Sequence, residues 1–360
     1  MFANFSIQMS PNAKKNTIYS LVLLGLVLIV YLYRNSTGSS TTTNDDLARK
    51  KGLITWNGKF MNQPYLFLFY PERPNLESKL DSLLTYQEQL YLMESPRSEL
   101  YQLNRQDSLP QPSKELLSLL KMATQDASSS ANTWDPSSGI LYQGWVFSSS
   151  RAALKDSANI PALLENVGMN KFLLSDTLIQ KLKSGMKVDF SDYGKAIALA
   201  QVARMFEKEG IQNYFLQIGR HTLAKGVNER KELWKYKTQY PDSLGKAKEG
   251  LIALQTKAVA TAGSFTQSYP QDSIRKAWVL DPRTGYPLNH GLLQTTVLAK
   301  DPKAAAILSE SLLVRGWQEA IRIDSARKDV EMVLVYYKKG KGLTTYSSPE
   351  LKSFLSFPIQ

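Results

Sequence analysis

The amino-acid sequence predicts an α+β fold, in which helices and strands alternate irregularly along the chain rather than in regular strand–helix pairs. Leucines with helical spacing over 76–90 indicate a helix with one apolar face. The run Tyr65–Tyr70 is apolar and aromatic and lies between prolines, which indicates a strand. The 360 residues are 43% hydrophobic, which is enough to bury one large core or two modest ones.

Further segments continue this irregular pattern along the chain. Those expected to be helices carry apolar residues at helical spacing: 113–127, 192–208 and 302–321. Those expected to be strands are short apolar runs: 213–218, 250–261, 294–299 and 331–337. Ser113 belongs to the residue types that cap helix N-termini, so it marks the start of the first of these helices.

The N-terminal region contains a candidate membrane span. Residues 17–33 carry no charge and would extend roughly 25 Å as a helix, the short end of a membrane crossing. Tyr19, Tyr31 and Tyr33 lie near its ends, where amphipathic rings favour the membrane interface. A cleaved signal peptide is the alternative, but no Ala-x-Ala cleavage site follows the apolar run. We therefore predict an uncleaved transmembrane anchor over 17–33.

The charges beside this span predict its orientation. Lys14 and Lys15 precede it and only Arg34 follows closely, so residues 1–16 are expected to form a cytoplasmic tail. Residues 34–50 are rich in Ser, Thr and Asn and are expected to form a flexible tether. The domain at 51–360 would then face outward from a cell inner membrane, on the periplasmic side.

The overall composition excludes several classes of site. The 44 basic and 32 acidic residues give a net charge of +12, but Lys and Arg are scattered and form no dense run, so no nucleic-acid partner is expected. A basic surface of this kind suits anionic lipid or an anionic cofactor. The absence of cysteine excludes disulfides, thiolate metal sites and cysteine nucleophiles. The two histidines, His221 and His290, do not suggest a zinc site or a Ser-His-Asp triad.

The segment 188–195 has the composition of an anion-binding site. Asp189 is expected at a strand end, and Lys195 follows six residues later near the start of a helix. This arrangement brings opposite charges and free backbone N–H groups close together, which suits a pyrophosphate. A solvated Asp–Lys pair at the surface is the alternative.

Five segments in order carry a family resemblance. They read Ser-Glu-Leu-Tyr-Gln-Leu-Asn (98–104), Trp-Asp-Pro-Ser-Ser-Gly (134–139), Val-Asp-Phe-Ser-Asp-Tyr-Gly-Lys (188–195), Ala-Thr-Ala-Gly (260–263) and Trp-Val-Leu-Asp-Pro-Arg-Thr-Gly (278–285). Each alone is a common turn pattern. Together they resemble the ApbE family of FAD:protein FMN transferases, whose motifs include Ser-Glu-Leu-x-x-Leu-Asn, Phe-Asp-Pro-Thr-x-Gly and Asp-Pro-Arg-Thr-Gly.

The resemblance implies a compact α+β fold and a specific reaction. Such enzymes cut FAD between its phosphates and transfer FMN to a Thr or Ser hydroxyl of a target flavoprotein. This phosphoryl transfer uses a metal ion to neutralise developing charge. A paralogue that holds flavin or assists a partner enzyme without chemistry is the alternative, and an unrelated anchored scaffold would require five coincidental matches.

The resemblance also implies which residues contact FAD: Met61, Trp134, Asp135, Asp189, Lys195, Thr261 and Trp278. Several have a structural alternative. Met61 and Trp278 could be core residues, and Asp135 could only start a turn, as Asp before Pro commonly does. The chain departs from the family at Trp278, which replaces a histidine, and at Glu94, which replaces a flavin-contacting tyrosine.

The metal-binding positions depart furthest from the family pattern. Relatives carry Asp-x-x-x-Thr on a helix that ends in glycine, and counting back from Gly316 puts Ala306 and Glu310 there. Asp192 stands where relatives use a backbone carbonyl. Two new carboxylates at one inferred site predict a rebuilt Mg²⁺ site formed by Asp192 and Glu310. Loss of the metal, with Glu310 on a solvated helix face, is the alternative.

The turn at 219–221 is also unusual, because it reads Gly-Arg-His where the family has Gly-Gly-Asp. The guanidinium of Arg220 can form paired hydrogen bonds with a phosphate. Arg220 could instead be a solvated charge.

Overall fold

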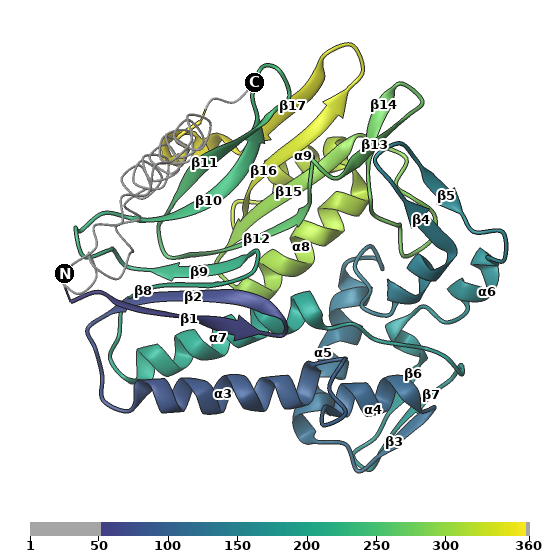
Figure 1. The fold of residues 1–360 in the computed structure, drawn as a ribbon, viewed down its shortest axis with the longest axis horizontal. Coiled ribbons are helices and arrows are strands. Elements are labelled where there is room, and N and C mark those ends of the chain that lie inside the picture. Colours follow the sequence, from purple (N-terminus) through teal and green to yellow (C-terminus); the bar gives the residue numbers. More distant parts are fainter. Residues whose placement is uncertain (1–51, 358–360) are drawn as a thin grey trace, which may run out of the picture. The chain divides into compact units, whose positions relative to one another are not determined.

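An eight-stranded antiparallel sheet organises the fold (Figure 1). Its strands follow the order β1 (Ile54–Phe60), β2 (Gln63–Tyr70), β8 (Asn213–Ile218), β9 (His221–Lys225), β12 (Lys257–Gly263), β15 (Leu292–Ala299), β16 (Glu331–Lys338) and β17 (Gly342–Ser347). Tight turns join three pairs of neighbours, β1–β2, β8–β9 and β16–β17, whereas longer segments connect the other neighbours. The β8–β9 turn uses Gly219 with a φ of 55°, a conformation that glycine adopts without strain.

The computed structural model describes residues 52–357. The predicted tail, anchor and tether at 1–16, 17–33 and 34–50 lie outside the described residues. Among the helices within 52–357, none combines the length and the apolar character that a membrane crossing needs.

Four helices pack beside the sheet: α3 (Leu76–Tyr91), α7 (Ser191–Lys208), α8 (Pro302–Arg315) and α9 (Trp317–Ala326). Figure 1 shows α3 and α7 side by side along the β1–β2 end, and α8 crossing β12 and β15. Leu80 of α3, Phe206 of α7 and Phe69 of β2 are almost fully buried in one large apolar cluster. This core fixes the N-terminal turn of α7 against the sheet.

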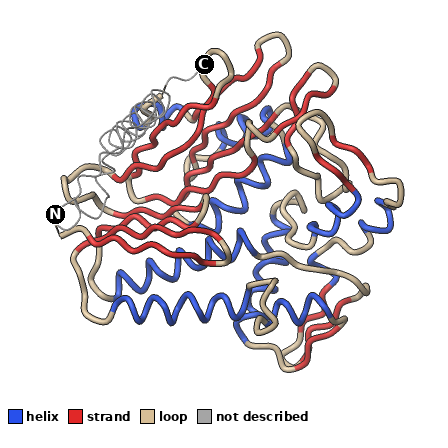
Figure 2. Tube along the Cα trace, in the orientation of Figure 1, coloured by secondary structure: helices blue, strands red, loops and turns tan. Residues whose placement is uncertain are grey.

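The remaining elements complete the fold, and Figure 2 shows how short many of them are. The helical ones are α4 (Glu99–Arg105), α5 (Lys114–Ser129), α6 (Ile160–Leu164), η1 (Ser138–Gly144), η2 (Met169–Lys171) and η3 (Pro349–Phe354). The strands are β3 (Ser108–Pro110), β4 (Trp145–Phe147), β5 (Ala152–Leu154), β6 (Phe172–Leu174), β7 (Leu178–Lys181), β10 (Trp234–Pro241), β11 (Ala247–Leu254), β13 (Ser268–Gln271) and β14 (Ile274–Ala277).

The α+β prediction is confirmed, and most predicted elements occur. The strand at 213–218 has the predicted bounds, and the strand and helix predicted over 65–70 and 76–90 lie within β2 and α3. Ser113 caps α5, since its hydroxyl oxygen accepts a hydrogen bond from the Leu116 amide at 3.1 Å.

Two predictions were wrong because each predicted element is divided into two by a turn. The strand expected over 250–261 is two strands, β11 and β12, separated by a turn in which Thr256 has a φ of 47°. The helix expected over 302–321 breaks at Gly316, whose φ of 91° ends α8 before α9 begins. At Gly316 apolar residues lie on both sides of the turn, so periodicity alone did not reveal the break. At Thr256 the exposed polar residues Gln255 and Thr256 interrupt the apolar run, and the prediction passed over this interruption.

Candidate active site

The candidate site is a cavity of about 400 Å³ between the start of α7 and the middle of α8. The β8–β9 turn, the end of β12 and the loops around Trp134 and Leu280 complete its walls. Six of the residues predicted from the sequence line it: Trp134, Asp135, Asp192, Lys195, Thr261 and Glu310. The fold therefore brings together residues that are far apart in the sequence.

Asp192 is the centre of a charged cluster at the start of α7. Its Oδ1 accepts a hydrogen bond from Lys195 Nζ at 2.7 Å and lies 3.4 Å from His221 Nε2. The Asp192 side chain is 58% exposed, but toward the cavity, so protein atoms still surround it. Burial by itself raises the pKa of Asp192, but His221 and Lys195 outweigh it and hold that pKa well below its usual range.

Glu310 contributes a second carboxylate to the same cavity. It lies on α8 and is half-buried. Burial, together with the negative charges of Asp192 and Asp189, raises its pKa to about 8, although Lys195 and Arg220 oppose the shift. At neutral pH Asp192 is thus ionised and Glu310 is largely protonated. A bound cation would favour ionisation of both.

Asp192 and Glu310 are the two carboxylates that the sequence predicted as metal ligands. Within the part of the chain that the structure describes, no cluster of three or more His, Asp or Glu side chains forms a complete metal site. Mg²⁺ commonly binds one or two carboxylates together with substrate phosphates and water. Asp192 and Glu310 therefore fit Mg²⁺ bound with a phosphate ligand.

Asp189 lies beside this cluster but has a different role. Its Oδ1 accepts hydrogen bonds from the Ser191 amide at 2.8 Å and the Ser191 hydroxyl at 2.5 Å, closing the turn that leads into α7. Its own amide donates to Pro136 O at 2.8 Å, which joins this segment to the Trp134 loop. Asp189 lines a smaller neighbouring cavity of about 230 Å³ rather than the main one.

The smaller cavity also contains Met61. Its other walls include Tyr91 and Met93, and it shares Gln63 and Lys195 with the main cavity. The Met61 amide donates to Glu88 Oε1 at 2.7 Å, which holds the β1–β2 turn against α3. Thioether and aromatic side chains around a small cavity suit a flat ring.

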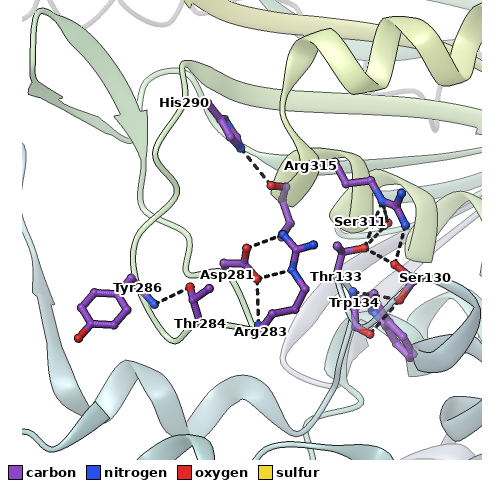
Figure 3. Close-up of polar contacts among 11 residues, drawn as sticks. Ser130, Thr133, Trp134, Asp281, Arg283, Thr284, Tyr286, His290, Ser311 and Arg315 are labelled. Carbon is purple, nitrogen blue, oxygen red and sulfur yellow. Dashed lines mark hydrogen bonds and ion pairs between the residues drawn. The ribbon is translucent and has the colours of Figure 1, made fainter. Parts of the chain in front are cut away.

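The loop that contains Trp134 and Asp135 is tied to α8 (Figure 3). Arg315 donates from Nη2 to Ser130 O at 2.6 Å, and Thr133 and Ser311 share a hydrogen bond of 2.6 Å between their hydroxyls. Trp134 is buried and packs on Tyr193 of α7, with ring centroids 5.0 Å apart. These contacts hold the loop at the cavity wall.

Asp135 is buried, and its carboxylate accepts hydrogen bonds mainly from its own turn. Its Oδ1 accepts from the Ser137 amide at 2.8 Å and the Ser137 hydroxyl at 2.6 Å. Burial raises the pKa of Asp135, while these hydrogen bonds and the charge of Lys171 oppose the shift. Asp135 thus borders the cavity chiefly as part of the loop framework.

The Asp-Pro-Arg-Thr-Gly loop at 281–285 has a similar turn (Figure 3). Asp281 accepts hydrogen bonds from Arg283 Nε at 2.9 Å and Arg283 Nη2 at 2.6 Å, and from the Arg283 amide at 2.9 Å. Only Val279, Leu280 and Pro282 of this region reach the main cavity. Trp278 lines neither cavity and is half-buried, with an indole N–H that has no partner within residues 52–357.

Three further residues at the cavity were not among the predicted contacts. Arg220 extends from the β8–β9 turn, and its guanidinium hydrogen-bonds to Gly263 O. His221 is buried beside it. Tyr142 is 41% exposed and accepts a hydrogen bond from the Leu280 amide at 3.3 Å. The unusual Gly-Arg-His turn was a signal for the first two, whereas no local pattern identified Tyr142.

Comparison with known proteins gives a consistent result. The ApbE family model matches residues 56–334. An FAD:protein FMN transferase of Salmonella typhimurium is 28% identical over 288 residues, covering 78% of this chain and 82% of the relative. That of Escherichia coli strain K12 is 26% identical over 288 residues, with the same shares. The structure of the flavin transferase ApbE from Vibrio cholerae has a TM-score of 0.71 at 23% identity, covering 84% of this chain and 99% of that one.

Proposed function

This chain belongs to the ApbE family, and we propose that it is an FAD:protein FMN transferase that modifies a Thr or Ser hydroxyl of a target flavoprotein. The observation that carries the proposal is the meeting of Lys195, Arg220 and two carboxylates at one cavity. Cations at a diphosphate and acids for a metal are what phosphoryl transfer requires. The names of the similar proteins from Salmonella and Escherichia coli support the same reaction.

The reaction balances without any redox step. The oxygen of the acceptor hydroxyl attacks the phosphorus of the FMN half of FAD and forms a new P–O bond. The bond between that phosphorus and the bridging oxygen breaks, and AMP leaves with the bridging oxygen. The hydroxyl proton goes to solvent. The products are AMP and a protein that carries FMN through a phosphodiester.

The residues of the cavity suggest how FAD is held. Lys195 lines both the main and the smaller cavity, so its ammonium can contact the diphosphate where the two meet. Arg220 lies on another wall of the main cavity and can bind phosphate oxygens through two N–H groups. Met61 and Tyr91 in the smaller cavity can pack against a ring of FAD, while Trp134 and Asp135 hold the adjoining loop.

Asp192 and Glu310 would hold Mg²⁺ together with the phosphates of FAD. The metal would supply positive charge to the phosphates as the P–O bond breaks. Before FAD binds, Lys195 and His221 already contact Asp192 Oδ1. They keep the carboxylate ionised and oriented toward the cavity.

A flavin-binding paralogue that performs no transfer is the second candidate. The contact between Lys195 Nζ and Asp192 Oδ1 at 2.7 Å favours it, because that ion pair satisfies the carboxylate without a metal. Incubating the protein with FAD, a threonine- and serine-containing peptide mixture and Mg²⁺ separates the two. An FMN-sized mass increase on peptides, lost when EDTA is added, supports the transferase. Tight FAD binding with no adduct supports the paralogue.

The cellular setting is part of the proposal. Residues 17–33 would anchor the chain in the inner membrane as a single span, with residues 51–360 on the periplasmic side next to the target flavoprotein. The full-length chain should stay in the membrane pellet after alkaline carbonate extraction, and a chain lacking residues 1–40 should be released. Extraction of the full-length chain by carbonate would contradict the anchor.

A further inference from the structure

A third cavity adjoins the main one, and we propose that it binds an extended segment of the acceptor protein and delivers its Thr or Ser hydroxyl to the phosphate. This inference rests on the proposed transferase function. The cavity measures about 420 Å³ and lies between the β10–β11 hairpin and the loop after β12. It shares two wall residues, Arg220 and Thr261, with the main cavity. A ligand in this third cavity would therefore lie next to a phosphate bound by Arg220, because Arg220 lines both cavities.

The chemistry of the walls distinguishes this acceptor groove from the smaller cavity beside Met61. Every side chain that lines the groove carries a polar group, and most are uncharged hydroxyls or amides. Such groups can hydrogen-bond the backbone N–H and C=O groups of an extended chain without selecting one side chain. The smaller cavity differs because apolar side chains, those of Met61, Tyr91 and Met93, lie among its polar wall residues, and these apolar groups suit a ring. The two side cavities thus fit the two different substrates of one transfer reaction.

The groove has a fixed floor and accessible edges. Tyr236 and Thr238 of β10 are buried, and the Tyr236 hydroxyl bonds to Thr261 Oγ1 at 3.0 Å. Thr261 in turn bonds to Thr296 Oγ1 at 2.9 Å. Thr266 and Gln267 at the edge are exposed. A rigid floor with accessible polar edges lowers the entropy cost of ordering a peptide.

The charges at the groove also favour a polypeptide over a second nucleotide. Lys237 and Glu249 lie at its edge, 3.7 Å apart and mostly exposed, so they compensate each other. Among the described residues, Arg220 is then the one cation of the groove that has no ion pair, and it lies at the boundary with the main cavity. Phosphate would bind at that boundary, because Lys237, the other cation of the groove, is already paired with Glu249.

The test obstructs the groove at Gln267 and uses Gln271 as a matched control. Both glutamines are exposed and lie four residues apart, but only Gln267 lines the groove. The full-length protein in detergent is incubated with FAD, Mg²⁺ and synthetic peptides that contain one central threonine or serine between randomised residues. FMN transfer to peptide is followed by flavin fluorescence of the peptide fraction, and FAD affinity by fluorescence titration.

We expect Gln267→Trp to lower kcat/KM for the peptides by about tenfold or more, through a higher peptide KM, since about 1.4 kcal/mol of lost binding corresponds to that factor. FAD affinity should stay unchanged, which also shows that the variant folds. Gln271→Trp should resemble the wild type. If Gln267→Trp fails to fold, Thr266→Trp obstructs the same edge.

Three outcomes would overturn the inference, and they are distinguishable. Wild-type peptide kinetics in both obstructed variants would show that the acceptor binds elsewhere. Weakened FAD binding by a folded Gln267→Trp protein would assign the groove to FAD. Tight FAD binding with no transfer by the wild type would remove the transferase function, and the acceptor groove with it.

Discussion

The Asp-Pro loops and the start of α7 border the same cavity, but their aspartates are used differently. Asp135 and Asp281 accept hydrogen bonds from the amides two residues later, at 2.8 Å and 2.9 Å, so their carboxylates stabilise their own turns. Asp192 instead contacts His221 of β9 and Lys195 of the next turn of α7. Asp192 also lines the main cavity.

The hydrogen-bond partners of each aspartate indicate whether its carboxylate can serve a ligand. An aspartate whose Oδ1 accepts the amide two residues on forms a local turn in almost any protein, with no further role required. Asp189 belongs to this group, since it accepts from the Ser191 amide. Asp192, three residues later, does not. We therefore propose that Asp192 serves the ligand and that the other three aspartates hold the framework, and point mutations test this division.

The largest expected effect comes from Asp192→Asn, which keeps the shape of the side chain and removes its charge. If Asp192 holds Mg²⁺ at the phosphates, FMN transfer to peptides should fall by about a hundredfold or more, because metal charge stabilisation is worth several kcal/mol. Calorimetric titration with Mg²⁺ in the presence of FAD should show the binding heat reduced. Unchanged transfer by Asp192→Asn would place Asp192 with the framework aspartates and end the distinction.

Lys195→Ala should give the next largest effect. Loss of a hydrogen bond to a charged group costs roughly 1.5–3 kcal/mol, so FAD affinity should weaken by about tenfold or more in a fluorescence titration. Lys225→Ala is the matched control, because Lys225 is also ion-paired, to Glu207 at 2.8 Å, but lies away from the cavity. Equal FAD affinity in the Lys195 variant and the wild type would remove Lys195 from the site.

Much of the fold was predictable from the sequence because local patterns are strong there. The stripe of leucines in α3 and the capping by Ser113 are signals within a few residues of each other. The break at Gly316 was missed, since apolar residues lie on both sides of that turn. The break at Thr256 was missed although Gln255 and Thr256 are polar and exposed, so it was readable from the sequence.

Residues of the candidate site were predictable only where a sequence motif identified them. The ordered motifs identified Asp192 and Lys195, and the count back from Gly316 identified Glu310. All three line one cavity, although they come from two helices. Trp278 was expected at FAD but lines neither cavity, because the chain turns after it and presents Val279 and Leu280 instead. Tyr142 reaches the cavity through its contact with the Leu280 amide, a tertiary contact that no local pattern encodes.

Glu310→Gln tests whether the second carboxylate is held protonated. Burial and the charges of Asp192 and Asp189 raise its pKa from 4.5 to about 8, against Lys195 and Arg220. The folded state then keeps a proton that the unfolded chain loses, so this group's contribution to stability falls as pH rises from about 4.5 to about 8 and is constant above. Glutamine does not titrate.

The melting temperature of Glu310→Gln relative to the wild type, measured without metal or FAD, should therefore increase across that pH range. A difference that stays constant with pH would mean that Glu310 is ionised throughout. In the wild type, FAD with Mg²⁺ should reduce the pH dependence, because a cation between the two carboxylates favours the charged form of both.

The smallest expected effect is that of Asp281→Ala, which tests an aspartate that stabilises its own turn. The change removes an acceptor for the Arg283 amide and guanidinium, so urea denaturation should show a loss of about 1 kcal/mol in the free energy of unfolding. FAD affinity should stay the same, since Asp281 does not line the main cavity or the smaller one. The result expected for Asp192→Asn is the reverse: little loss of stability and a large loss of transfer. If Asp281→Ala instead weakens FAD binding at unchanged stability, the turn aspartates also serve the ligand, and hydrogen bonding to the local amide no longer separates the two kinds of aspartate.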